Sequence, residues 1–218
     1  MTTKKQIAVI LSGCGVYDGA EIHESVLTLL AIARQGAEYT LFAPDIEQHH
    51  VINHLTGEPT DEKRNVLIEA ARIARGQIKA LSTYKAGDFD ALMLPGGFGA
   101  AKNLSTVAFD GPNCTIDADT EHAVKTTHAA GKPIGALCIA PAVITKILGD
   151  ITVTIGQDEG TAQAIEAMGG NHVTTDHGEV IVDESNKVAT TPCYMLDANI
   201  LQIAEGAEKV TQAVLQMA

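Results

Sequence analysis

Cys138 is the residue whose type and setting point most directly to chemistry. It joins an apolar, strand-like segment at 133–137 to a helix expected at 139–148. Pro141 suits the first turn of that helix, where its missing N–H costs no hydrogen bond. The helix would direct free N–H groups and its positive dipole end at the sulfur, which predicts a thiolate with a lowered pKa. The alternative is a small apolar side chain buried at a strand end.

The segments around Cys138 predict an α/β fold. Apolar β-branched runs alternate with segments of helical periodicity, which is typical of parallel strands joined by helices. Because ligands bind beyond the carboxyl ends of such strands, the turns at 12–15, 95–99 and 138–141 should meet in one crevice. We expect strands at 6–11, 38–43, 78–81, 91–94, 133–137, 151–155, 180–182 and 188–190, and helices at 21–35, 61–74, 117–130, 139–148, 161–168 and 196–216.

Composition limits the class of protein. The 218 residues are 45% hydrophobic and only 4% aromatic, which predicts a single domain over residues 1–218 with an aliphatic core. The net charge of −12 opposes binding to nucleic acid or to anionic membranes. No apolar run approaches the ~18 residues of a membrane span. The four cysteines lack CxxC spacing, as expected for free thiols, and residues 7–11 are too short for a signal-peptide core, so we predict a cytoplasmic location.

Five segments resemble the ElbB branch of the class I glutamine amidotransferase-like superfamily, which includes the PfpI proteases and the parkinsonism-associated deglycase. The similarity extends along nearly the whole chain. It implies a flavodoxin-like three-layer sandwich, with a mostly parallel sheet between helices on both faces. The segments are 12–24 (SGCGVYDGAEIHE), 51–57 (VINHLTG), 65–72 (NVLIEAAR), 94–104 (LPGGFGAAKNL) and 138–142 (CIAPA).

The resemblance implies a catalytic pair. A nucleophilic cysteine on a sharp strand-to-helix turn, the nucleophile elbow, maps onto Cys138, and a carboxyl group from the first helix maps onto Glu24. A carboxylate on an otherwise apolar helix is costly to bury without a partner. Buried beside the sulfur, Glu24 would stay protonated, donate a hydrogen bond to the thiolate and move a proton during turnover. The alternative is a role in a capped first turn, and the neighbouring Glu21 is expected to be solvated.

Backbone amides are the expected oxyanion and substrate-binding groups. In the family a glycine pair after a strand has this role together with the amide that follows the cysteine. These positions are Gly96, Gly97 and Ile139 in this chain. Glycine lets the backbone approach a bound carbonyl closely. The alternative is a glycine turn that only needs a positive φ.

The lack of histidine at the family's usual positions is the main departure from the family pattern. Glutamine-hydrolysing members use a Cys-His-Glu triad, whereas residue 139 is Ile and the segment 154–156 has no His. His23 is a secondary candidate, although adjacent helical residues point about 100° apart. Cys14 is a second candidate thiol, with a structural role as the alternative. His50 and His54 have a spacing that suits a metal, but no third ligand is evident and we predict no metal site.

The resemblance implies a cofactor-independent glyoxalase, a lyase that converts glyoxal to glycolate. The Cys138 thiolate would add to a small aldehyde substrate to give a hemithioacetal. Relatives commonly form dimers, so we expect a homodimer. Two alternatives stay open: a redox-sensing or stress-regulatory protein with an oxidisable cysteine, and an auxiliary amidotransferase-like protein in isoprenoid metabolism. The physiological substrate, the third catalytic residue and the oligomeric state cannot be derived from the sequence.

Overall fold

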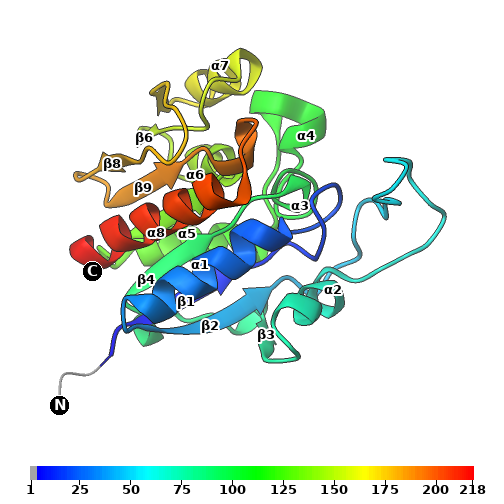
Figure 1. Cartoon of the computed structure of the whole chain (residues 1–218), viewed down its shortest axis with the longest axis horizontal. Helices are drawn as coiled ribbons and strands as arrows, with labels where there is room; N and C mark the ends of the chain where they lie inside the picture. The colour runs from blue at the N-terminus through cyan, green and yellow to red at the C-terminus, as the bar shows by residue number, and fades with distance from the viewer. Residues whose placement is uncertain (1–3) are drawn as a thin grey trace.

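The computed structural model describes residues 4–218 and contains a seven-stranded sheet between two layers of helices (Figure 1). The strand order is β3-β2-β1-β4-β5-β9-β8, and each neighbouring pair is parallel except β8 with β9. The predicted flavodoxin-like α/β fold is therefore confirmed. The strands of this sheet are β1 (Gln6–Ile10), β2 (Glu38–Ala43), β3 (Ile78–Ala80), β4 (Ala91–Leu94), β5 (Ile134–Leu137), β8 (Ile181–Asp183) and β9 (Val188–Thr191).

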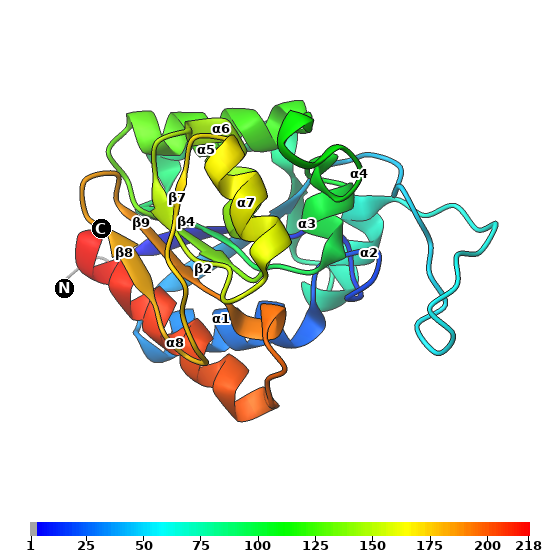
Figure 2. The same ribbon diagram turned by 90° about the horizontal axis from the view of Figure 1, so that it is seen from above.

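Helices cover both faces of the sheet. Figure 2 shows α5 and α6 on one side and α1 and α8 on the other. No helix within residues 4–218 combines the length and the apolar character needed to cross a bilayer. The helices are α1 (Ile22–Arg34), α2 (Val66–Ile73), α3 (Phe98–Lys102), α4 (Val107–Asp110), α5 (Ala118–Ala129), α6 (Ala140–Leu148), α7 (Glu159–Ala167) and α8 (Ile200–Met217).

The central strand β1 contributes to two hydrophobic cores, one on each face of the sheet. Side chains alternate between the two faces of a strand. Ala8 and Ile10 join the core beneath α5 and α6, whereas Ile7 and Val9 join the core beneath α1 and α8. All four are essentially inaccessible to solvent. A continuous apolar run is what a strand covered on both faces requires.

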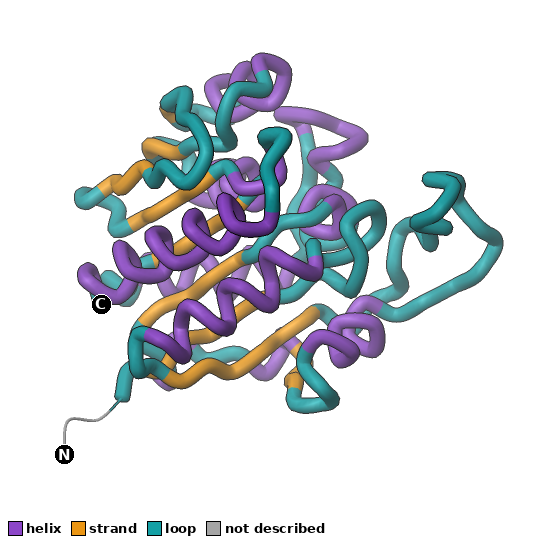
Figure 3. The backbone as a smooth tube through the Cα atoms, viewed as in Figure 1, coloured by secondary structure: helices purple, strands orange, loops and turns teal. Residues whose placement is uncertain are grey.

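The helix predicted at 61–74 is too long. The structure begins α2 at Val66, with the Asn65 side chain as its N-cap. Residues 46–65 instead form a long arm that projects from the body of the protein (Figure 3). Its stem is closed by backbone hydrogen bonds from Val66 N to Ile46 O (2.9 Å) and from Gln48 N to Arg64 O (2.8 Å). Because the Arg64 carbonyl already accepts from Gln48 N across the stem, it is not free to accept within a helical turn.

The strand predicted at 151–155 is shorter and lies outside the main sheet. Only β6 (Thr152–Val153) is regular, and it pairs with β7 (Asn171–His172) in a separate two-stranded sheet. Its side chains still pack into the core: Ile151, Val153 and Ile155 are buried. The alternating apolar residues of this segment therefore reflect burial and not hydrogen bonding within the main sheet.

Asn103 fixes the loop after β1 against the segment after β4. Its side-chain amide donates to Ser12 O and to Asp18 O, both at 2.9 Å, and its oxygen accepts from His49 N at 2.9 Å. Because the residue is buried, these three backbone groups have no ready substitute in solvent. Asn103 therefore joins three separate segments beside the carboxyl ends of the strands.

Replacing Asn103 should destabilise the protein. Asn103→Ala leaves three backbone groups unpaired, and we expect the free energy of unfolding to fall by roughly 2–4 kcal/mol. Urea denaturation measures the change, with Asn171→Ala as the control, because Asn171 is exposed and makes one long side-chain hydrogen bond. Equal effects of the two substitutions would contradict this account.

Candidate active site

Cys138 lies on a strained turn between β5 and α6. Its φ of 59° is in the left-handed region that non-glycine residues rarely adopt. Its N–H donates to Thr191 O on β9 at 3.0 Å, which holds the turn to the sheet. The residue is 7% exposed. Ile139 is the N-cap of α6 and Pro141 lies in the first turn, so the expected strand–cysteine–helix junction is present.

Glu24 is fully buried on α1 and contacts the sulfur. Its two carboxyl oxygens accept from Gly96 N at 2.9 Å and from Tyr194 N at 3.2 Å, and the carboxyl group is hydrogen bonded to the Cys138 side chain. Two backbone segments far apart in the sequence thus hold this carboxyl group. The structure brings together Glu24 and Cys138, the two residues predicted to be catalytic.

Glu21 is buried, contrary to the expectation that solvent surrounds it. It is the N-cap of α1, and its carboxyl oxygen accepts from Glu24 N at 2.7 Å. Its own N–H donates to Gly96 O at 3.0 Å. This capping places a second acid directly beneath Glu24.

The three predicted oxyanion groups divide into two roles. The amides of Gly97 and Ile139 donate to the Cys138 sulfur, so they point to where a bound carbonyl oxygen would develop charge. The Gly96 amide is occupied by Glu24, so the oxyanion role predicted for it is corrected to a positioning role. Gly96 must also be glycine for space, because an added Cβ would lie 2.8 Å from Glu24 Oε2 and would collide with the Cys138 Cβ.

Burial sets the proton affinity of Glu24. Loss of solvent, followed by the nearby Glu21 carboxylate, raises its pKa to about 7 against the opposing effects of the Tyr194, Cys138 and Gly96 hydrogen bonds. A carboxyl group with this pKa exchanges its proton near neutral pH. It is therefore suited to act as a base and then as an acid in one reaction.

The pKa of Cys138 is raised, which contradicts the lowered pKa predicted from the sequence. Burial is the main cause and the charge of Glu24 the next, and together they outweigh the amides of Gly97 and Ile139, which lower the pKa. The sequence pattern shows a helix N-terminus but not how completely the sulfur is enclosed. Glu24 is the ionisable side chain that contacts this sulfur.

A cavity of about 340 Å³ gives access to the sulfur. Apolar side chains form much of its wall, and Asp158 and Thr161 at the start of α7 add polar groups. The turns predicted to meet at 95–99 and 138–141 supply Gly97, Phe98, Cys138 and Ile139, and the other lining residues come from loops and helix ends elsewhere in the chain. The cavity is lined by Val16, Gly97, Phe98, Cys138, Ile139, Asp158, Thr161, Tyr194 and Met195.

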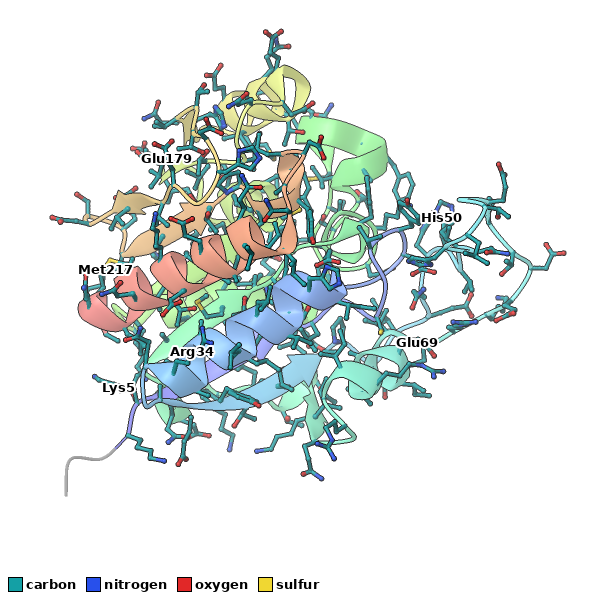
Figure 4. All side chains as sticks on the ribbon, viewed as in Figure 1. Lys5, Arg34, His50, Glu69, Glu179 and Met217 are labelled. Atoms are coloured by element: carbon teal, nitrogen blue, oxygen red, sulfur yellow. The ribbon has the colours of Figure 1, made fainter. Side chains whose placement is uncertain are left out.

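The secondary candidates lie outside this cavity wall. His23 is exposed, and its Nδ1 is 2.8 Å from the hydroxyl oxygen of Tyr194, so it contacts a lining residue rather than the sulfur. Cys14 is half-buried, and burial followed by the Glu69 carboxylate raises its pKa. Glu69 lies on α2, on the side of the molecule that carries the projecting arm (Figure 4). Neither residue completes a triad with Cys138.

The paired histidines of the arm do not form a metal centre. His54 Nδ1 is 3.0 Å from Ile52 O, and its Nε2 accepts from Tyr17 N at 3.2 Å. His50 packs against His49 and Phe109. In the part of the chain that the structure describes, no three His, Cys, Asp or Glu side chains are grouped to hold a metal.

Sequence comparison identifies the family. A human relative named glutamine amidotransferase-like class 1 domain-containing protein 3, mitochondrial, is 46% identical over 222 residues, which covers 97% of this chain and 83% of the relative. The chain belongs to the class I glutamine amidotransferase-like family. No model of a protein family matches the sequence.

Solved structures agree with the fold. An Ehrlichia chaffeensis isoprenoid biosynthesis protein with an amidotransferase-like domain superposes with a TM-score of 0.92 at 35% identity and covers 98% of this chain and 99% of its own. Glyoxalase III from Candida albicans shares the fold with a TM-score of 0.62 at 14% identity and covers 98% of this chain and 97% of its own.

The predicted cytoplasmic location is wrong. The human relative, and ES1 proteins from rat and zebrafish that are 45% and 37% identical, are all named as mitochondrial proteins. The prediction relied on free cysteines and on the short apolar segment near residue 7. Free thiols indicate a reducing environment but do not distinguish one reducing compartment from another.

Gly96 gives a test of the packing at this site. Gly96→Ala places a methyl group against Cys138 and Glu24, and we expect the free energy of unfolding to fall by roughly 1–3 kcal/mol. Gly87→Ala is the matched control, because an added Cβ there meets nothing within 4 Å. Urea denaturation compares the two. A Gly96 variant as stable as the Gly87 variant would refute the close contact.

The raised pKa of Glu24 predicts how stability depends on pH. Between pH 4.5 and about 7 the folded protein binds the Glu24 proton more tightly than the unfolded chain does. The contribution of Glu24 to the free energy of unfolding is therefore fully present below pH 4.5. It falls by about 3 kcal/mol as the pH rises through 7. Denaturation at pH 4.5, 6 and 8 should show this loss in the wild type relative to Glu24→Gln. Parallel pH profiles would contradict it.

Proposed function

We propose that this protein is a cofactor-independent glyoxalase that converts glyoxal, a small reactive dialdehyde, to glycolate. The observation that carries the proposal is a buried carboxyl group, with a pKa of about 7, hydrogen bonded to a cysteine that opens into a small cavity. Such a pair can form a carbon–sulfur bond and then move protons within the adduct. The resemblance to glyoxalase-containing relatives supports this choice of chemistry.

The first step forms a hemithioacetal. The Glu24 carboxylate accepts the proton of the Cys138 thiol as the sulfur bonds to one aldehyde carbon of glyoxal. Charge develops on the carbonyl oxygen, where the amides of Gly97 and Ile139 can donate hydrogen bonds. The oxygen then takes the proton back from Glu24. Because the carboxyl pKa is near neutrality, both transfers occur without a strongly acidic or basic group.

The second step is an internal oxidation and reduction. Glu24 removes the C–H proton of the carbon attached to sulfur and returns it to the neighbouring carbon, while the hydroxyl proton of the first carbon moves to the oxygen of the second. The first carbon becomes a thioester and the second a CH₂OH group, so one carbon is oxidised as the other is reduced. Water then cleaves the C–S bond, which releases glycolate and regenerates the thiol. The net change is the addition of one water molecule, and no external oxidant is consumed.

The alternatives are less well supported by the site. Glutamine hydrolysis by a Cys-His-Glu triad requires a histidine beside the sulfur, and the lining residues include none. Release of ammonia from glutamine is the assay that would favour it. A redox sensor would depend on oxidation of the same Cys138 sulfur. Intact-mass measurement after mild peroxide treatment would detect that alternative.

Cys138→Ala should abolish glyoxal turnover, with at least a 100-fold loss of kcat/KM, because the nucleophile is gone. Cys114→Ala is the control: it also removes a buried thiol, but Cys114 is not part of the cavity wall. Glycolate production is measured by NMR, and circular dichroism verifies the fold. Turnover that survives in the Cys138 variant would sink the proposal.

A further inference from the structure

One ionised side chain, that of Asp158, lies in the wall of the cavity that contains Cys138. Asp158 lies directly before α7 and is exposed at the cavity that contains Cys138. The other lining residues include no Asp, Glu, Lys, Arg or His. The charge of Asp158 is therefore the main charge that an incoming molecule meets before it reaches the sulfur.

Capping of α7 fixes the Asp158 carboxylate in place. Its Oδ1 accepts from Thr161 N at 2.7 Å, and the Thr161 hydroxyl also donates to it. These hydrogen bonds lower the pKa of Asp158 below its usual value. The group thus stays ionised at neutral pH and cannot turn away without uncapping the helix.

No cation in the cavity wall balances this charge. The lining residues that the structure describes include no Lys, Arg or His. Lys102 packs its ammonium group 5.2 Å from the ring centroid of Phe98, but it donates to Tyr17 O at 2.9 Å and is not part of the wall. Beneath the sulfur, Glu21 and Glu24 add two further acidic groups.

We propose that Asp158 is a specificity-determining residue that makes this cavity favour uncharged carbonyl compounds, such as neutral 2-oxoaldehydes, over aldehydes that carry a carboxylate or phosphate. The choice of an aldehyde rests on the proposed function, whereas the charge selection does not. The apolar side chains of Val16, Phe98 and Met195 suit a hydrogen or methyl substituent on such a molecule. An anionic substituent would instead lie among carboxyl groups with no positive partner.

The expected size of the effect follows from the exposure of Asp158. Solvent screens a charge at a cavity mouth, so its repulsion of a second charge is modest, on the order of threefold to fivefold in rate or affinity. The same screening makes the effect depend on salt. At about 0.5 M salt the Debye length is well below 10 Å, and most of the discrimination should disappear.

Alkylation of Cys138 tests the proposal without relying on turnover. Iodoacetamide and iodoacetate transfer closely similar groups with the same leaving group, but only iodoacetate is charged. Rates at Cys138 are measured by peptide mass spectrometry and divided by the rates with N-acetylcysteine amide. The wild type should disfavour iodoacetate, and Asp158→Asn, which retains a capping side chain, should reduce that discrimination about threefold to fivefold.

Asp117→Asn is the matched control, because Asp117 caps α5 through Thr120 in the same pattern and lies outside the cavity wall. Its discrimination should equal that of the wild type. Equal discrimination in the Asp158 and Asp117 variants would overturn the proposal, as would failure of both reagents to reach Cys138. If glyoxal turnover survives in Cys138→Ala while the alkylation ratio still depends on Asp158, the glyoxalase function fails but the charge selection stands.

Discussion

The contact between a buried carboxyl group and a buried sulfur is the constraint on which this structure depends. Glu24 has lost its solvent entirely, and without partners an ionised group in that position would be very costly. The protein surrounds it with two backbone N–H groups and the Cys138 side chain. With these partners the pKa of Glu24 is about 7, so the carboxyl group is near the midpoint of its titration at neutral pH. Glu24 can both gain and lose a proton readily, and this is the feature of the site best suited to chemistry.

The backbone around Glu24 and Cys138 allows the two side chains to lie in contact. Gly96 brings the backbone close enough to bind Glu24 and has no side chain to push Cys138 away. The left-handed backbone of Cys138 turns the chain sharply from β5 into α6. The energetic cost of that conformation is met by the surrounding sheet and helix, as is common where a reactive side chain must be displayed. The position of the Cys138 sulfur therefore depends on the folded turn between β5 and α6.

Much of the architecture could be predicted from the sequence, because parallel strands covered on both faces are long apolar runs and helix ends carry capping residues. The strand prediction at 151–155 (ITVTI) was too long, because its three apolar side chains are buried but only two of its residues form a strand. Resemblance identified Glu24 and Cys138, and burial beside the sulfur predicted that Glu24 would hold its proton. The raised pKa of Cys138 was not predicted, because it depends on three-dimensional enclosure. The Asp-x-x-Thr pattern at Asp158 signals a helix cap. Its place beside the sulfur follows only from the fold.

The hydrogen bond from Tyr194 to Glu24 joins residues 170 positions apart. Contacts of such long range form late, because most of the chain must be ordered before they can close. On the ribosome, the first helix emerges long before the turn that contains Tyr194. A nascent chain therefore cannot hold this acid in its final environment until synthesis is almost complete. The Glu24–Cys138 pair therefore reaches its enclosed environment only at the end of folding.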